Sequence, residues 1–355
     1  MKFAITKSTL ENMLSTLQPF LEKKDNSQIT AHILFQVAPD ELVLKATDME
    51  MGLSITCKEL IPESFGSFTC HGKKILDIIR ILKEGQVTLE NDGDNVLIKQ
   101  NRSKYKLPSF DASTFPNFPV SENLPKVNID SQKLITAFKK VSPAIAVNNP
   151  KFELNGALID VRGAVINVVS TDTKRLALYK IEQTADKNLS IIIPKKAISE
   201  IQKIFAADLK LYYDETNLIM VSEDYFFFTK VISGKFPDYE RIIPRELAHL
   251  FTLNTEKMID AIRQVSILSQ EIRITFESGL ITFETLQQDN EEAKTGFETE
   301  ATVENPFSVA VNSRFLLDFL GQCGTESFVL GFNEPNMPFQ LKSEQFSTIV
   351  MPIIL

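Results

Sequence analysis

The chain has 355 residues, of which 43% are hydrophobic and 24% charged, and its formal net charge is −8. This length exceeds what one hydrophobic core organises, so we expect two or three domains of a globular protein. The acidic balance excludes a protein that is basic all over, but it leaves room for a local basic surface. No apolar run has the length of a membrane span, and residues 1–14 lack a secretory signal pattern, so we expect a cytoplasmic protein without a membrane partner.

Cysteine and histidine are sparse, and their spacing argues against a metal site. The residues are Cys57, Cys70, Cys323, His32, His71 and His249. The cysteines are too scattered for a disulfide framework or a zinc site, and the histidines lie far apart in the sequence without the spacing of metal ligands. A glycine-rich phosphate loop is also missing from the sequence. We therefore expect no metal, no cofactor and no catalytic residue.

From the N-terminus, the first pattern is a short alternating strand followed by an amphipathic helix, and it recurs twice. The copies are "FAITKSTLENMLSTLQ" from Phe3, "VNIDSQKLITAFKKVS" from Val127 and "FTLNTEKMIDAIRQVS" from Phe251. Both intervals are 124 residues, from 127 − 3 and 251 − 127. In each copy, apolar residues at offsets of four and seven define one helix face. In the first copy, Ser8 and Glu11 match a capping box.

A second helix pattern follows later in each copy, at residues 68–82, 191–205 and 307–321. After each of these helices, the sequence has a pair of apolar runs with Asp, Asn, Gly or Pro between them, which is typical of β-hairpins. The sequence thus predicts an α+β fold of three similar domains, at residues 1–122, 123–246 and 247–355.

A Thr-Asp phrase marks the same turn in the first two copies, as Thr47-Asp48 and Thr171-Asp172. In the simpler interpretation, each aspartate accepts hydrogen bonds from its own turn. The alternative makes Asp48 and Asp172 a carboxylate pair for acid/base chemistry, although equivalent positions in two domains would normally lie far apart.

Positive charge gathers on or beside the repeated helices, whereas the strands and loops hold much of the acid. A chain that is acidic in sum but basic on one class of element suggests a surface that faces a polyanion. The lysines could equally serve only to keep helix faces soluble, and charge alone does not decide between the two.

Six short segments, spread in order along the whole chain, match the sequence pattern of a known protein family. They are "MKF", "ATDMEM", "LNG" at 154–156, "STDTKRLA", "GKFPDYERIIP" and the closing "VMPIIL". With the threefold repeat, the chain resembles the bacterial DNA sliding clamps, the β subunits of the replicative DNA polymerase III holoenzyme.

The resemblance implies three tandem clamp domains, with helices lining the inside of a ring and antiparallel sheets outside. It implies a processivity factor, a head-to-tail homodimer that encircles duplex DNA, slides along it and tethers the polymerase without being an enzyme itself. A multidomain scaffold, or an enzyme that uses Asp48 and Asp172 without encircling DNA, is the alternative.

The family's DNA contacts, which do not depend on base sequence, map by resemblance onto basic and polar positions. These DNA-facing positions are Lys23, Lys24, Lys73, Arg80, Asn148, Asn149, Lys151, Phe152, Lys195, Lys196 and Lys203. Which of the first two lysines approaches DNA is left open.

A pocket between domains 2 and 3 binds clamp-binding peptides in this family. Its partners are the replicative polymerase subunit, the clamp loader, and repair and ligation proteins. The matching pocket positions are Leu154, Thr171, Lys174, Arg175, Leu176, Pro237, Arg241, Ile242, Ile349, Val350, Met351, Pro352 and Ile353.

The family's subunit contact pairs an edge of the first domain with the third. The matching positions are Ile78, Leu82, Tyr105, Leu107, Ile267 and Leu268. As apolar residues on a surface they would need a partner to cover them. Ordinary core packing is the alternative for Ile78 and Leu82.

Overall fold

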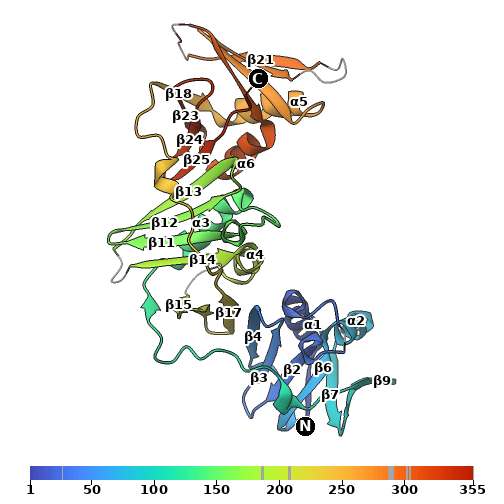
Figure 1. Ribbon diagram of the computed structural model, residues 1–355. Helices are drawn as coiled ribbons and strands as arrows, with labels where there is room; N and C mark the ends of the chain where they lie inside the picture. The colour runs from blue at the N-terminus through green and yellow to red at the C-terminus, as the bar shows by residue number, and fades with distance from the viewer. Residues whose placement is uncertain are drawn as a thin grey trace. The chain divides into compact units, whose positions relative to one another are not determined.

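The protein is described from a computed structural model, which gives the structure of residues 1–25, 27–184, 188–206, 209–286, 292–300, 303 and 305–354 (Figure 1). The chain forms two compact units. The first combines Met1–Asn128 with Lys203–Val231, and the second combines Ile129–Gln202 with Ile232–Leu355. The predicted domain limits at residues 122 and 246 stay a prediction.

The first unit contains a five-stranded antiparallel sheet in the order β5-β1-β7-β8-β9. Its strands are β1 (Lys2–Thr6), β5 (Ile61–Ser64), β7 (Gln86–Asp92), β8 (Asn95–Gln100) and β9 (Ser103–Pro108). Strand β9 alternates exposed and half-buried residues from Lys104 on, and among the described strands it pairs only with β8. It is therefore an edge strand with unpaired backbone groups on its outer side.

An eight-stranded sheet completes the first unit, in the order β10-β15-β16-β17-β4-β3-β2-β6. The strands are β2 (His32–Val37), β3 (Leu42–Thr47), β4 (Met51–Cys57), β6 (Gly66–His71), β10 (Lys126–Val127), β15 (Lys210–Tyr213), β16 (Asn217–Val221) and β17 (Tyr225–Lys230). Strand β17, from the second repeat, pairs with β4 from the first, with Phe227 opposite Leu53. The sheet is thus continuous across the two repeats.

Two helices cover this unit, α1 (Lys7–Leu17) and α2 (Gly72–Ile81), and they contact each other (Figure 1). The N-cap of α1 is Thr6, whose hydroxyl accepts a hydrogen bond from the backbone N–H of Thr9. The predicted capping box is therefore wrong, because Ser8 lies inside the helix. Lys7 instead pairs with Glu11 at 2.7 Å.

Two of the three histidines, His32 and His71, lie side by side in the fold. Strands β2 and β6 place His32 opposite His71, with ring centroids 5.6 Å apart, and Phe110 stacks on His32 at 4.2 Å. Burial, with the nearby charges of His71 and Lys74, lowers the pKa of His32 to about 4. The ring of His32 is therefore neutral at physiological pH and packs as a core side chain.

The second unit is built on another eight-stranded antiparallel sheet, in the order β14-β11-β12-β13-β25-β24-β23-β18. The strands are β11 (Gly156–Arg162), β12 (Val165–Thr171), β13 (Arg175–Glu182), β14 (Leu189–Pro194), β18 (His249–Asn254), β23 (Ser327–Phe332), β24 (Phe339–Ser343) and β25 (Phe346–Val350). At its centre, β13 of the second repeat pairs with β25 of the third. This pairing joins two repeats into one sheet.

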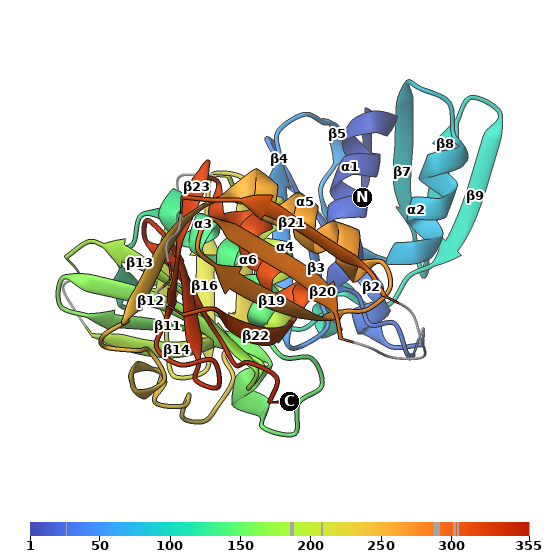
Figure 2. The same cartoon turned by 90° about the horizontal axis from the view of Figure 1, so that it is seen from above.

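A four-stranded sheet in the order β21-β20-β19-β22 belongs to the same unit. It consists of β19 (Glu271–Glu277), β20 (Leu280–Thr285), β21 (Lys294–Glu298) and β22 (Phe307–Asn312). Helix α5 (Thr255–Ser266) packs on β20 and β21, and α6 (Ser313–Cys323) packs beside α5 (Figure 2).

The remaining helices are α3 (Ser131–Val141) and α4 (Lys195–Ile204). Short 3-10 turns occupy Gln18–Phe20, Ile29–Ala31, Ala112–Thr114, Ser142–Ala144, Phe152–Leu154 and Tyr239–Arg241. Helices α1, α3 and α5 occupy the predicted amphipathic segments. Their buried faces are Leu10, Met13, Leu14 and Leu17, then Leu134, Ala137, Phe138 and Val141, then Met258, Ala261, Ile262 and Val265. The helix repeat inferred from apolar spacing is confirmed.

The Thr-Asp turns adopt the same geometry twice. Asp48 Oδ1 accepts hydrogen bonds from the N–H groups of Glu50 and Met51, at 3.0 and 2.9 Å. Asp172 Oδ1 does the same for Lys174 and Arg175, at 3.0 Å each. Both carboxylates therefore stabilise their own turns, as the simpler interpretation predicted.

Of the helices in the described ranges, none is both long enough and apolar enough to cross a membrane.

Candidate partner and DNA sites

The second unit brings the predicted pocket positions together around β13 and the end of β25. Leu176 lies opposite Ile349, and Arg175 lies opposite Val350. Beyond the strand, the N–H of Met351 donates to the carbonyl of Lys174 at 2.9 Å. The tail then runs on to Ile353, whose N–H donates to the carbonyl of Ala310 at 2.7 Å. The C-terminal tail is thus fastened to both repeats of the unit.

A hydrophobic cluster lies under these positions. It consists of Leu158, Val169, Leu176, Ile192, Phe236, Tyr239 and Ile349, with Leu178, Ile232 and Ile243 packed against it. Four predicted pocket residues are almost completely buried: Leu154, Leu176, Ile349 and Val350. These four side chains therefore form the base beneath the more exposed predicted positions, and their contact with a partner stays a prediction.

The residues that do reach the surface are fewer. Met351 is 41% exposed and Ile242 is 39% exposed, and the Arg241 side chain is 85% exposed. Lys174 is also exposed, whereas Pro237, Pro352 and Ile353 are half-buried. Thr171 is buried because its hydroxyl donates to the carbonyl of Arg175 at 2.6 Å.

Arg175 corrects the sequence prediction most clearly. Its side chain is only 6% exposed, and Nη1 donates to Asp318 Oδ2 at 2.6 Å while Nε donates to Asp172 Oδ2 at 3.1 Å. Nη2 donates to the carbonyl of Pro143, and the guanidinium lies 4.6 Å from the Phe315 ring centroid. A guanidinium committed to three acceptors is not available to a peptide. Arg175 instead links β13 to α6.

A second cation supports the same junction. Lys140 Nζ donates to the carbonyls of Gln322 and Cys323, at 2.8 and 3.2 Å, at the end of α6. It also lies 5.2 Å from the Phe346 ring centroid. Burial lowers the pKa of Lys140. This lysine of the repeated helices therefore caps α6 instead of facing outward.

A buried hydroxyl holds the segment that carries Arg241. The Tyr239 hydroxyl donates to Asp160 Oδ2 at 2.7 Å and accepts from Asn167 Nδ2 at 3.0 Å. Burial first, and the hydrogen bond to Asp160 second, raise the pKa of Tyr239. Arg162 extends this network from Asp160 to Glu240, at 2.8 and 2.9 Å. The wall of the site is therefore fixed to β11 and β12.

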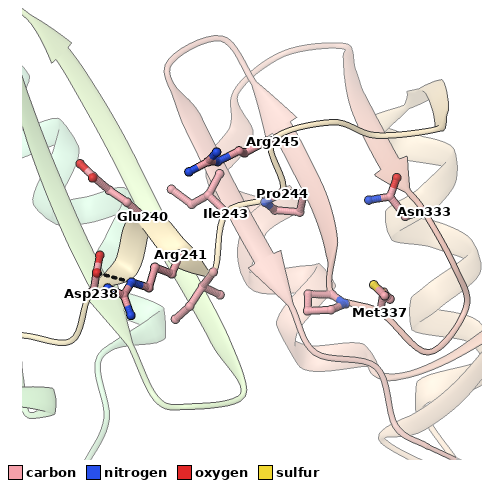
Figure 3. Close-up of a pocket in the computed structure, with 10 residues that line it drawn as sticks. Asp238, Glu240, Arg241, Ile243, Pro244, Arg245, Asn333 and Met337 are labelled. Atoms are coloured by element: carbon pink, nitrogen blue, oxygen red, sulfur yellow. Dashed lines mark ion pairs between the residues drawn. The ribbon is translucent and has the colours of Figure 1, made fainter.

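Beside this wall lies a cavity of about 640 Å³ (Figure 3). Its lining residues are Asp238, Glu240, Arg241, Ile242, Ile243, Pro244, Arg245, Asn333, Met337 and Pro338. Arg241 and Ile242 belong to the predicted pocket. The other lining residues were not predicted, and three of them, Asn333, Met337 and Pro338, come from the turn between β23 and β24, which carries no periodic pattern. The Pro-rich phrase "NEPNMP" indicated only a turn.

Most of the DNA-facing positions are exposed, as that role requires. Lys23, Lys24, Lys73, Arg80, Asn148, Lys151, Phe152, Lys196 and Lys203 are exposed, and Asn149 is half-buried. Asn149 forms hydrogen bonds with Asn155 in both directions, at 2.8 and 2.9 Å, and its carboxamide also accepts from the N–H of Lys151. Their assignment to DNA stays a prediction.

Lys195 is an exception. It is half-buried, and its Nζ donates to the carbonyl of Ile145 at 2.9 Å. Burial is the main cause that lowers its pKa, and the charges of Arg175 and Arg314 act in the same direction. The structure therefore uses the ammonium group to hold a loop, and a direct DNA contact is not supported.

The predicted subunit contacts differ in exposure. Ile267 is 81% exposed and Leu268 is 45% exposed, whereas Leu82 is 9% exposed. Leu82 follows the last turn of α2 and packs inward, as its core-packing alternative predicted. Ile81, the last residue of α2, is 70% exposed. Ile78, Tyr105 and Leu107 are half-buried.

The whole chain is similar to known proteins. Models of the N-terminal, central and C-terminal domains of the DNA polymerase III beta subunit match residues 1–119, 128–238 and 240–354. The chain is 38% identical to the beta sliding clamp of Helicobacter pylori J99 over 374 aligned positions, covering 100% of both chains. It is 26% identical to the beta sliding clamp of Pseudomonas aeruginosa, again covering 100% of both.

Solved structures agree over the full length. The Helicobacter pylori beta clamp bound to a DNA ligase peptide has a TM-score of 0.95 at 39% identity, covering 100% of both chains. The Pseudomonas aeruginosa DNA polymerase III subunit beta has a TM-score of 0.93 at 25% identity, also covering 100% of both. The chain belongs to the DNA polymerase III beta subunit family, the beta sliding clamps. It is accordingly a DNA polymerase processivity factor built of three tandem clamp domains, and not an enzyme.

Proposed function

We propose that two copies of this chain close head to tail into a ring around duplex DNA in the cytoplasm. The ring slides along DNA and tethers the replicative polymerase, the clamp loader, and repair and ligation proteins. The observation that carries this proposal is the full-length match of three clamp-domain models in tandem. A head-to-tail contact joins unlike surfaces, and it closes a ring when the rotations add to a full turn.

Exposed apolar residues support a contact between copies. Ile81 on the first unit and Ile267 with Leu268 on the second present apolar side chains to solvent. The edge strand β9 also offers unpaired backbone groups. Surfaces of this kind favour burial against a partner chain.

Retention by topology explains how the protein can hold DNA and still move. Many strong phosphate contacts would bind tightly but would have to break at every step, whereas a closed ring needs only weak, exchangeable attraction. Exposed lysines on the repeated helices supply that attraction without reading base sequence. The mechanism therefore needs no catalytic group.

The partner site is proposed at the tail, the β12–β13 turn and the segment that carries Arg241. Support comes from their placement in one unit over a shared apolar cluster, with Met351 and Ile242 exposed. The Helicobacter pylori clamp, which carries a bound DNA ligase peptide, has the same fold. An apolar anchor entering such a site is a common mode of peptide recognition.

The enzyme alternative loses its chemical basis, because the Asp48 and Asp172 carboxylates accept hydrogen bonds from their own turns. Retention on DNA distinguishes a clamp from a scaffold that does not encircle DNA. A clamp stays on circular DNA and leaves linear DNA, whereas such a scaffold would not distinguish the two.

Replacing Lys73, Arg80 and Lys151 together by glutamine should weaken DNA association and reduce its salt dependence. Each lost phosphate contact lowers the slope of log K against log salt by about 0.9. Lys195→Gln is the matched control, because its ammonium group binds the Ile145 carbonyl. The measurement is equilibrium binding of the protein, without a clamp loader, to short open-ended duplex DNA at several salt concentrations, with molar mass measured in parallel. An unchanged slope, or dimers that fall apart in the triple variant, would contradict the DNA assignment.

A further inference from the structure

We propose that the cavity beside Arg241 is an additional binding site for the flank of a partner peptide, which places an apolar side chain and a carboxylate there. This inference rests on the proposed partner function. The cavity lies between the segment from Asp238 to Arg245 and the turn between β23 and β24 (Figure 3). It adjoins the proposed peptide site through Arg241 and Ile242, which line both.

Hydrogen bonds hold both walls of the cavity in place. On one side, Tyr239 is fixed through Asp160 and Asn167. On the other side, Asn333 accepts from the N–H of Ala248 at 2.8 Å and donates to the carbonyl of Glu246 at 2.9 Å. Because hydrogen bonds already fix both walls, the cavity loses little conformational entropy when it binds a peptide segment.

The apolar lining of the cavity includes two exposed side chains. Ile242 is 39% exposed and Met337 is 48% exposed. Figure 3 shows Met337 and Asn333 on the side opposite Asp238 and Arg241. Methionine adapts its shape to different apolar partners, and Pro244 and Pro338 stiffen the backbone beside it. An apolar side chain from a partner would fit between these walls.

The charges of the lining favour an acidic partner. Asp238 pairs with Arg241 at 2.7 Å, and Glu240 pairs with Arg162 at 2.9 Å. Arg245 is exposed and has neither an ion pair nor a hydrogen-bond partner among the described residues. Among the cations that line the cavity, Arg245 is therefore the one without a counter-charge in the described part of the chain. A guanidinium recognises a carboxylate with two parallel hydrogen bonds.

The test uses a synthetic clamp-binding peptide of a bacterial DNA ligase in its core form and in extended forms. The extensions add Glu-Leu at the N-terminal or the C-terminal end, and matched neutral peptides add Gln-Leu instead. We expect one Glu-Leu peptide to bind the full chain about five- to tenfold more tightly than the core peptide. Arg245→Gln and Met337→Ser should each reduce that gain to less than about twofold, with binding of the core peptide unchanged.

Lys342→Gln is the matched control, because it removes an exposed cation from β24, outside the cavity lining. If the core peptide binds but neither extension gains affinity, or if the gain survives Arg245→Gln, the additional site is wrong and the peptide pocket stands. If the core peptide itself does not bind, the proposed partner pocket is wrong and the additional site falls with it. Loss of the dimer in Arg245→Gln or Met337→Ser, measured by sedimentation, would place a second copy of the chain in the cavity and overturn the proposal.

Discussion

Deleting residues 351–355 should lower the affinity for a DNA ligase peptide at least about 100-fold, which corresponds to about 2.7 kcal/mol. The truncation removes the exposed Met351 and the tail backbone that bonds to Lys174 and Ala310. It leaves β25 complete through Val350, so the sheet of the second unit keeps its strands. The measurement is fluorescence anisotropy with the labelled peptide, accompanied by thermal unfolding.

Point variants sharpen this prediction. Met351→Ala should account for about a tenfold loss, because a partly exposed apolar anchor contributes roughly 1–2 kcal/mol. Ile354→Ala is the matched control, since Ile354 is 77% exposed and lies outside the predicted wall. Binding within twofold of the full chain after the deletion would remove the tail from the partner site.

Replacing Arg175 by methionine should destabilise the second unit by about 3 kcal/mol. The change leaves Asp172 and Asp318 without their shared cation and the Pro143 carbonyl without its donor. Removing one member of a buried ion pair costs about 3–5 kcal/mol, and the partial exposure of both carboxylates lowers the expected value toward the bottom of that range. Urea unfolding measures the loss, and hydrogen exchange should locate it at α3, β13 and α6.

Arg314→Gln tests whether burial causes this effect. The Arg314 guanidinium also approaches Asp318, at 3.9 Å, but its side chain is 72% exposed. An exposed ion pair contributes roughly 0–1 kcal/mol, so the expected destabilisation is about 0.5 kcal/mol or less. Equal losses in the two variants would show that Arg175 is not the link between β13 and α6.

Local features of the fold could be predicted from the sequence. Apolar spacing located helices α1, α3 and α5, because one amphipathic face repeats every three to four residues. The turns at Asp48 and Asp172 could be predicted for a similar reason, since their hydrogen bonds join residues two or three positions apart. These features depend on neighbouring residues alone.

Features that depend on distant partners could not be predicted. The acceptors of Arg175 include Asp318, 143 positions away, and no local pattern announces that pair. The sequence around Lys195 is typical of a surface lysine, and only the fold brings its ammonium group to the carbonyl of Ile145. The pairings of β17 with β4 and of β13 with β25 are likewise non-local. A partner for each of these strands could be expected, but not which one.

The resemblance predicted which positions form the partner site, but not how deeply their side chains are buried. It placed Leu154, Leu176, Ile349 and Val350 on the wall, and the structure buries all four. It gave no indication of Asn333 or Met337, which come from a turn without periodicity. Burial is set by packing between strands, so a position carried over by motif does not determine whether its side chain reaches the surface.

Retention on DNA of different topology tests the central claim most directly. The protein, loaded on a nicked circular plasmid by its clamp loader, is passed through a gel-filtration column before and after the plasmid is cut once by a restriction enzyme. We predict that it stays with the circle at a salt concentration that removes charge-bound proteins, and that it is lost from the linear form. Equal retention on both forms, or equal loss from both, would contradict a ring that encircles DNA.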